Sequence, residues 1–497
     1  MKEHVQGSWE EAEKEGTRFR LEGKSGESIG YFQAALRRFP GNIALMNGLG
    51  LALLDANRTG EACEVLQEAV RYLPGSAPLI FNLGNALRAN GDPAGGIGAY
   101  ERAIALGLDR SEVFNNLGIA LQECDRWDDA LRAFGEALRR DARYLPALAN
   151  TGYSLMQAGR PEEAVPYLRR AVEQEPGYAD ARWLLSHALL VTGRWPEGWD
   201  EYEWRWHRMH QAAYHHGNQK SRWNGEDIAG KSVLLYAEQG IGDAVQFARY
   251  APLVAAMGAT VYIECHAALV PLFRGLSGVA GVFARGEVLP AFDVACPLLS
   301  LPGVFRTTPG TIPGGVPYVV PDAGRVVRWR ALLGGEGGVM HVGLVWAGNM
   351  SHVNDRKRSV PSGLLAPFAA VSGVKYFGLQ KGDPGDRRCL PPPGMRITEC
   401  GEGLLDFGDT AALVSVLDLV ITVDTAVAHV AGALGKPVWV MLPFVPDWRW
   451  LLKRDTSPWY PSMRLFRQTS PGDWRSVVSL ISGHLRTCSA KHLQSCY

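Results

Sequence analysis

A repeat of 34 residues runs through the first 212 residues, and no other feature of the sequence constrains the fold as strongly. One register holds small residues: Gly16, Gly50, Gly84, Gly118 and Gly152, with Ser186 continuing the series. Two further registers hold an alanine (Ala35, Ala69, Ala103, Ala137, Ala171) and a large side chain (Phe32, Leu66, Tyr100, Phe134, Leu168). Small residues let two helices approach closely and the large side chain fills the space beside them, so each period predicts a pair of packed helices. Pro40, Pro74 and Pro176 are expected to end the second helix of their periods.

The order Leu-Gly, Ala, Phe or Tyr, Ala and Pro within each period resembles that of tetratricopeptide repeats. Six units are expected, at 9–42, 43–76, 77–110, 111–144, 145–178 and an incomplete, Trp-rich 179–212. Stacked helix pairs of this kind make an extended groove. We therefore expect residues 1–212 to form an α-solenoid whose concave face binds a protein or peptide, the alternative being a scaffold alone.

The charge balance argues against nucleic acid as a partner, and the cysteine pattern favours a reducing compartment. Lys plus Arg and Asp plus Glu each number 51, so the basic excess that attracts nucleic acid is missing. The eight cysteines form no CxxC pair, which favours reduced thiols over a disulfide framework or a zinc ribbon. The first residues lack the apolar stretch of a signal peptide, and charge, Gly or Pro interrupts every long apolar segment. We expect a cytoplasmic protein with no membrane span.

The polar linker at 210–230 interrupts the repeat and contains His215 and His216. Adjacent histidines could bind a metal, but consecutive side chains point apart and no third ligand is nearby. A solvated loop is the expected structure, and no metal site is expected in the chain.

From Lys231 onwards, short β-branched runs alternate with helical stretches, which predicts parallel sheets with crossover helices. Strands are expected at 232–237, 260–265, 292–296, 341–346, 375–379, 419–423 and 437–442, and helices at 244–257, from about 362, and up to Leu434. The domains are expected at 213–335 and 336–470, with a terminal helix and tail at 471–497. A cleft between the sheet ends is expected to bind ligand. The terminal helix, at 470–485, is expected to cross back to the first of these domains, with a loose tail after it.

A glycine turn, Gly240-Ile241-Gly242-Asp243, follows the first of these strands. The glycines allow a tight turn and a close backbone approach, but the third glycine of a dinucleotide fingerprint is absent. Asp243 is either a helix-terminal carboxylate or a catalytic acid–base group, and the turn alone leaves both open.

The segment 420–437, VITVDTAVAHVAGALGKP, is more specific. A hydrophobic strand ends at Asp424, Thr425 opens a helix, and His429 lies one turn inside it. A helix N-terminus with free N–H groups suits a diphosphate, to which Thr425 can donate and His429 can hydrogen-bond or pair. The alternatives are an N-cap role for Asp424 and a satisfied core histidine at 429.

A cationic loop, from Trp346 through Asn349 to Arg356, Lys357 and Arg358, leaves a strand at the same predicted sheet end. Its cations would neutralise a leaving diphosphate. The alternative is a solvated basic loop.

The GIGD turn, the cationic loop and the DTAVAHVAGALGKP helix together resemble the heptosyltransferase-type glycosyltransferases (glycosyltransferase family nine), which have a GT-B fold of two Rossmann-like halves. The fused repeats and the segments TGRWPEGWDEYEWRW and PDWRWLLKRDTSPWYPSMRLFRQ resemble bacterial tetratricopeptide-repeat glycosyltransferases. The resemblance implies inverting, metal-independent sugar transfer from a nucleotide sugar, without a cofactor.

Roles for particular residues follow from the same resemblance. Asp243 matches the acidic residue that acts as general base on the attacking hydroxyl. Thr425 and His429 match donor-phosphate positions, and Arg358 takes the place of the family's lysine. The implied donor-binding set is completed by Asn349, Arg356, Gln380, Asp424 and Ala426, and the acceptor-side loop by Gln239, Gly240 and Gly242.

An aromatic group, Trp448, Trp450, Trp459 and Tyr460, follows the last expected core strand. We expect it to be a packed interdomain plug rather than a sugar-stacking platform, with Asp447 and Arg449 reaching the cleft. The Trp-rich helix of the last repeat unit is expected to pack on the α/β part.

The sequence thus predicts a glycosyltransferase whose repeats select a protein acceptor. One competitor is a repeat-based adaptor with an inactive transferase-like domain. The other is a saccharide or lipid-core transferase in which the repeats only localise the enzyme.

Overall fold

The computed structural model describes residues 7–208, 222–334, 338–352, 354–382 and 387–495, and divides the chain into two compact units, Met1–Leu185 and Ser186–Tyr497. His215 and His216, with most of the expected linker, lie outside the described residues. The first unit is helical and the second holds two parallel sheets with helices around them. The predicted succession of an α-solenoid and an α/β region is therefore confirmed.

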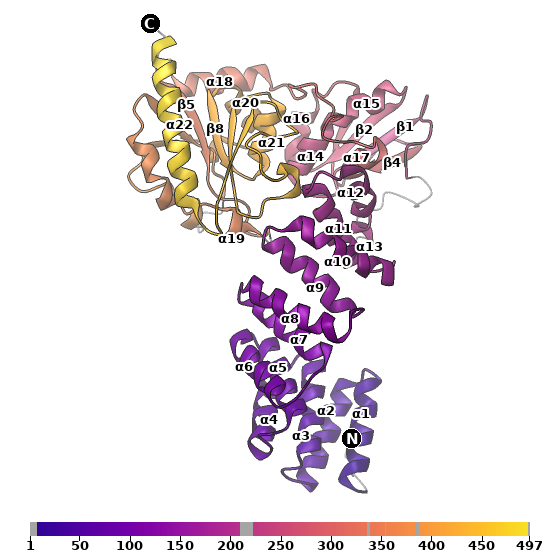
Figure 1. Cartoon of the computed structure of the whole chain (residues 1–497). Coiled ribbons are helices and arrows are strands. Elements are labelled where there is room, and N and C mark those ends of the chain that lie inside the picture. Colours follow the sequence, from indigo (N-terminus) through magenta and orange to yellow (C-terminus); the bar gives the residue numbers. More distant parts are fainter. Residues whose placement is uncertain (1–6, 209–221, 335–337, 353, 383–386, 496–497) are drawn as a thin grey trace. The chain divides into compact units, whose positions relative to one another are not determined.

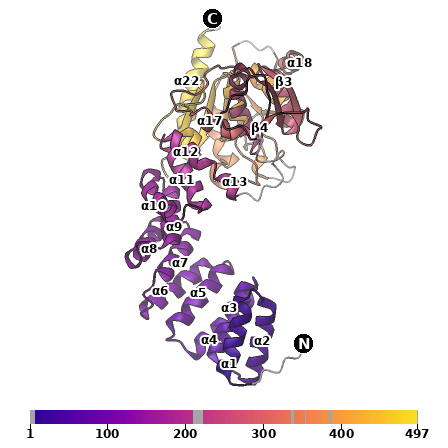
Figure 2. The same cartoon turned by 90° about the vertical axis from the view of Figure 1, so that its right-hand side faces the viewer.

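Antiparallel helix pairs make up the first unit, and they can be followed along the chain in Figure 2. The helices are α1 (Trp9–Leu21), α2 (Ser25–Arg38), α3 (Ile43–Asp55), α4 (Thr59–Tyr72), α5 (Ala77–Ala89), α6 (Pro93–Ala105), α7 (Ser111–Glu123), α8 (Trp127–Arg140), α9 (Leu145–Gln157) and α10 (Pro161–Gln174). Three second helices, α2, α4 and α10, each end two residues before a proline, as the sequence predicted.

The repeated glycines hold each pair together at close range. A Cβ atom at Gly84 would lie 2.7 Å from the ring of Tyr100, and one at Gly118 would lie 2.4 Å from Phe134. The same clash with the large residue of the pair would occur at Gly16, Gly50 and Gly152. The alanines of the second register are fully buried, so the predicted packing logic is confirmed.

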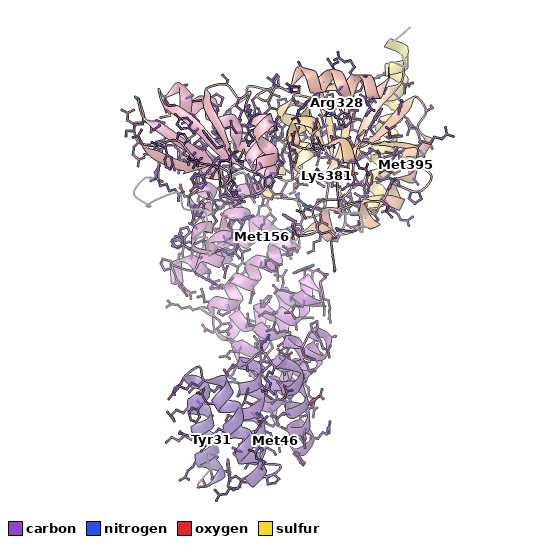
Figure 3. All side chains as sticks on the ribbon, turned by 180° about the vertical axis from the view of Figure 1, so that it is seen from behind. Tyr31, Met46, Met156, Arg328, Lys381 and Met395 are labelled. Carbon is purple, nitrogen blue, oxygen red and sulfur yellow. The ribbon has the colours of Figure 1, made fainter. Side chains whose placement is uncertain are left out.

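The first helices of neighbouring repeats, α1, α3, α5, α7 and α9, contact one another in succession. The second helices of neighbouring repeats contact one another less than the first helices do. The more closely spaced row lies on the inner side of a curved stack, so the first helices form the concave wall. Met46 of α3, labelled in Figure 3, is buried in the continuous core behind this wall.

Three helices precede the first sheet: α11 (Ala179–Val191), α12 (Trp195–Tyr202) and α13 (Arg205–Arg208). The second compact unit begins at Ser186, inside α11.

The first sheet has the strand order β3-β2-β1-β4, with all strands parallel. Its strands are β1 (Ser232–Tyr236), β2 (Thr260–Cys265), β3 (Val279–Ala284) and β4 (Val294–Pro297). We call this sheet and its helices the first half. The expected helix at 244–257 is divided into α14 (Ile241–Phe247), the 3-10 turn η3 (Ala248–Tyr250) and α15 (Ala251–Ala256). Pro252 lacks the N–H that a continuous helix would need there.

The second sheet, the centre of the second half, has the order β10-β9-β8-β5-β6-β7 and is also parallel. Its strands are β5 (Met340–Val345), β6 (Val374–Gly378), β7 (Ile397–Glu399), β8 (Leu419–Val423), β9 (Val438–Leu442) and β10 (Met463–Arg467). Its other elements include α18 (Ala323–Leu333), α19 (Asp355–Arg358), the 3-10 helix η6 (Ser362–Ala370), α20 (Phe407–Val416), α21 (Ala426–Ala433) and η9 (Trp448–Trp450). The strand order reverses between β5 and β8, and ligands of open α/β sheets bind at such a reversal.

The terminal helix differs from the prediction. It runs as α22 (Trp474–Ser495), so the tail expected from Thr487 is helical as far as Ser495. Trp474, Val477 and Ile481 are buried in the core of the second half, and Ser482 donates a hydrogen bond to the Pro367 carbonyl of η6 (3.3 Å). The predicted crossing to the first half is wrong, because the apolar face of α22 packs within its own half.

Candidate functional site

The glycine turn follows β1 and leads directly into α14. The amide of Gly240 donates a hydrogen bond to Asp243 Oδ2 (2.9 Å), so the carboxylate closes the turn that carries it. Gln239 accepts a hydrogen bond from the Tyr202 hydroxyl of α12 (3.2 Å). The side chain of Asp243 keeps 19% of its surface exposed, so it remains open to solvent on one side.

The start of α21 follows β8, at the reversal of the second sheet. Thr425 occupies the N-cap position, but its hydroxyl bonds Thr422 (3.1 Å) and makes no capping bond to the helix. The first N–H groups of α21, beginning with Ala426, are therefore left without a side-chain cap, which is the condition for binding an anion. Asp424 is half-buried and accepts from the indole of Trp450 (2.9 Å).

One predicted cation of the loop after β5, Arg358, contacts the start of α21. Arg358 Nη1 donates to the Asp424 carbonyl (3.0 Å), and the guanidinium passes over Gly348, where a Cβ atom would lie 2.7 Å from Nη2. Arg356 and Asn349 are exposed, and Asn349 Oδ1 accepts from the Ser351 amide (3.0 Å). Of these three predicted residues, Arg358 alone is directed to the helix start.

Gln380 holds the backbone at the beginning of the cationic loop. Its Oε1 accepts from the amides of Trp346 (3.2 Å) and Ala347 (3.0 Å), and its Nε2 donates to the Ala347 carbonyl (3.1 Å). Gln380 thus fixes the beginning of the cationic loop. Lys381, labelled in Figure 3, donates to the Leu404 carbonyl (2.8 Å) and ties the next residue to the same half.

The two motifs meet across the halves, because α14 and α21 lie side by side (Figure 1). A Cβ atom at Gly242 would lie 2.8 Å from His429 Cδ2 and 3.5 Å from Ala426 Cα. Glycine is therefore required for this close approach. The structure brings the Asp243 turn and the start of α21 to one place.

His429 is buried and held on two sides. Its Nδ1 is 3.1 Å from the Tyr460 hydroxyl, and its ring stacks on Trp450 with centroids 5.5 Å apart. Burial lowers the pKa of His429 to about 3, and the cations Arg449 and Arg249 act in the same direction. The ring is neutral near pH 7 and can serve a ligand as a hydrogen-bonding group rather than as a cation.

Arg449 is buried between the two halves, and its partners were not predictable from the sequence. Its guanidinium donates to Asp243, to Gln246 Oε1 (2.8 Å) and to Asp447 Oδ1 (2.8 Å). Two of these partners belong to the first half and one to the second. The loop behind it holds Leu451 at φ 51° and Lys453 at φ 50°, which are strained conformations for non-glycine residues and are typical of functional loops.

The carboxylates of the site have unusual proton affinities. Burial raises the pKa of Asp243, while Arg449 opposes that rise. Burial also raises the pKa of Asp424, and the neighbouring Asp447 adds to this effect. Burial alone would raise the pKa of Asp447, but Arg449 outweighs it and lowers the pKa.

The aromatic group forms the predicted plug. Trp448 and Trp459 are buried, and α12 packs on them: Trp195 stacks on Trp459 (5.0 Å between centroids) and Trp199 meets Trp448 edge-on (5.2 Å). Trp199 also donates to the Thr307 carbonyl (2.9 Å) of the first half. The predicted packing of the last Trp-rich repeat helix on the α/β part is confirmed.

The described ranges hold neither a candidate metal site nor a candidate membrane span. No three His, Cys, Asp or Glu side chains gather there as a metal site would need. No helix there combines the length and the apolar character needed to cross a membrane.

Comparisons with known proteins agree with this division of the chain. Tetratricopeptide-repeat models match residues 13–77, 81–144 and 155–198. The model of glycosyltransferase family 9 (heptosyltransferase) matches residues 400–440, which contain α20, β8, α21 and the beginning of β9. The N-terminal region consists of tetratricopeptide repeats, and a part of the second half is similar to this glycosyltransferase family.

Individual relatives were also found. Protein FlbA of Caulobacter vibrioides is 30% identical over 325 residues, which are 61% of this chain and 54% of that protein, so the chain spans about half the length of this relative. The crystal structure of MamA is 26% identical with a TM-score of 0.31, and covers 33% of this chain and 96% of its own. A tetratricopeptide-repeat protein of Thermus thermophilus is 18% identical with a TM-score of 0.32, and covers 37% of this chain and 100% of its own.

Proposed function

We propose that this protein is a glycosyltransferase with a GT-B architecture, which moves a sugar from a nucleotide-sugar donor to a hydroxyl of a protein acceptor, with inversion and without a metal. One observation carries the proposal: the segment similar to glycosyltransferase family 9 contains the uncapped start of α21, and Asp243 of the other half is held next to it. A candidate phosphate site and a candidate base would thus lie next to each other.

The donor diphosphate would bind at the first turn of α21. The N–H groups there, the Thr425 hydroxyl and the Arg358 guanidinium offer donors and positive charge to the phosphate oxygens. His429, being neutral, would contribute a hydrogen bond. Because guanidinium groups supply the charge that a leaving diphosphate needs, the reaction would not require a metal ion.

Asp243 would act as the general base. Both of its oxygens are held, one by Arg449 and the other by the Gly240 amide. A carboxylate has about four lone-pair positions, so an acceptor hydroxyl can still donate to it. Proton removal by a positioned carboxylate would make that hydroxyl nucleophilic as the bond from sugar to phosphate breaks.

The repeats would choose the acceptor. Asparagine amides form interrepeat hydrogen bonds along the concave wall, namely Asn82 to Asn47 (2.7 Å), Asn116 to Asn85 (2.9 Å) and Asn150 to Asn115 (3.0 Å). Each amide has more donor and acceptor positions than these bonds use. Such a row can hydrogen-bond the backbone of an extended peptide without reading its side chains. We also propose a cytoplasmic location, in keeping with the free cysteines among the described residues.

The first test is binding and turnover with a panel of nucleotide sugars. A thermal shift with one nucleotide sugar, abolished by Thr425→Ala together with Arg358→Gln, would support the donor site. Labelled donor offered with protein and with lipid-linked acceptors then separates the protein transferase from a saccharide or lipid-core transferase. Absence of binding to every nucleotide sugar would favour the adaptor and refute the proposal.

A further inference from the structure

Arg449 connects the candidate base to the opposite half of the second unit. Its side chain is 8% exposed, and its three nitrogens donate to Asp243, Gln246 and Asp447. The guanidinium also lies over the ring of Trp448, 4.2 Å from its centroid. Three hydrogen bonds and the contact with the Trp448 ring fix the orientation of the guanidinium. Because the guanidinium is fixed, it also fixes the orientation of the Asp243 carboxylate that it binds.

The two aspartates share this one cation. Arg449 Nη1 binds Asp447 and Nη2 binds Asp243, so each carboxylate receives part of the positive charge. Two carboxylates near each other raise each other's proton affinity, and a shared cation offsets the effect. Arg449 therefore offsets part of the negative charge that these two aspartates carry.

We propose that Arg449 is the positioning residue of Asp243: it orients the carboxylate toward the acceptor and keeps it in the proton-accepting form. The inference rests on the proposed function for its catalytic meaning, while the control of Asp243 ionisation stands by itself. Asp447 acts against Arg449: its negative charge raises the pKa of Asp243, and it pairs with the same guanidinium.

Several groups from the surrounding elements face Asp243. The ionisable ones are Tyr202 of α12, His352 of the cationic loop, His429 of α21, and Asp447 and Arg449 of the loop after β9. Burial is the largest influence on the pKa of Asp243 and raises it, and Arg449 is the strongest influence that lowers it. Removal of Arg449 should therefore leave burial opposed by weaker influences, namely the Gly240 amide and His352.

The test uses the full chain with ¹³C-labelled aspartate carboxyls, and the Asp243 signal is assigned by its loss in Asp243→Asn. In Arg449→Gln, the pKa of Asp243 should rise, because removing an opposite charge in contact moves a carboxyl pKa by roughly one to three. Arg449→Lys should give a smaller rise. Asp447→Asn should move the pKa in the opposite direction, since it removes a like charge and leaves Arg449 to Asp243.

Arg467→Gln is the matched control. Arg467 donates to the carbonyls of Trp450 (2.6 Å) and Arg454 (2.9 Å), so its loss loosens the same loop without touching Asp243. The Asp243 titration should stay at the parent position in this variant. If Arg467→Gln moved it as far as Arg449→Gln does, the effect would be structural and the inference would be overturned.

The pH profile of kcat/KM adds the catalytic readout. In Arg449→Gln, its acidic limb should move to higher pH with the Asp243 titration, with a loss of at least about tenfold below the new pKa and recovery above it. A shifted titration without detectable transfer in the parent would refute the proposed function and leave the control of ionisation standing. Transfer with an unshifted titration in both Arg449→Gln and Asp447→Asn would overturn the inference and leave the proposed function standing.

Discussion

A methyl group at Gly242 tests the contact on which the candidate site depends. In Gly242→Ala, the new Cβ would lie 2.8 Å from His429 Cδ2, closer than packed carbon atoms come. The imidazole cannot easily give way, because Tyr460 holds Nδ1 and Trp450 covers one face of the ring. The backbone at Ala426 lies 3.5 Å away on the same side. The two halves must therefore separate slightly.

Two opposing effects set the change in the free energy of unfolding of Gly242→Ala. Overpacking of this kind costs about 1–3 kcal/mol, whereas replacing glycine by alanine within a helix returns up to about 1 kcal/mol. The net loss should be about 0.5–2 kcal/mol in the free energy of unfolding. In a His429→Ala background the obstructing ring is gone, so Gly242→Ala should cost nothing. The coupling energy between the two changes should equal that net loss, about 0.5–2 kcal/mol.

Denaturant unfolding followed by tryptophan fluorescence suits the measurement, because all but three of the 15 tryptophans lie after residue 185. Gly483→Ala in α22 is the matched control: no atom lies within 4 Å of its Cβ position, so the variant should be as stable as the parent or more so. A Gly242→Ala cost that persists unchanged in the His429→Ala background would refute the contact.

The remaining predictions concern the repeats, pH and metal ions. Gly84→Ala should lower the melting temperature of the helical signal, because its Cβ would lie 2.7 Å from Tyr100, whereas Gly98→Ala meets no atom within 4 Å and should raise it; equal effects would contradict the packing described. Because the pKa of His429 is lowered from 6.5 to about 3, unfolding takes up a proton between these values, so stability should fall as pH drops through that window. His429→Gln should make the pH dependence shallower there, and an unchanged slope would show that another group causes it. Transfer should survive EDTA, because Arg358 supplies charge to the diphosphate; loss of turnover restored by magnesium or manganese would contradict this.

The sequence predicted the parts of the molecule that are encoded locally. A glycine and a large apolar residue recur at fixed spacing in the repeats, and the clash that a Cβ atom at Gly84 would make with Tyr100 shows the physical reason for that spacing. Buried parallel strands such as β5 and β8 are continuous apolar runs and were placed within a residue or two. Strands β3, β7 and β10 were missed, because half-exposed positions interrupt their apolar pattern.

The rest depends on contacts between distant segments. Asp243 and Arg449 are 206 residues apart, and no local pattern pairs them. The segment containing Arg449 was noticed for its tryptophans, which explain the plug but not the guanidinium between two aspartates. Gln380 was assigned to donor binding by resemblance, and the structure gives it hydrogen bonds to the loop backbone.

The most direct test of the account is the rate of sugar transfer by Asp243→Asn, once a donor and an acceptor are in hand. Asparagine keeps an oxygen for Arg449 but cannot accept a proton, and its amide group loses the bond from the Gly240 amide. Transfer should fall by about 10²–10⁴-fold, the usual contribution of positioned proton transfer, while donor affinity, set at the start of α21, changes little. Transfer within a few-fold of the parent rate, in a folded variant, would contradict the assignment of Asp243 as the base.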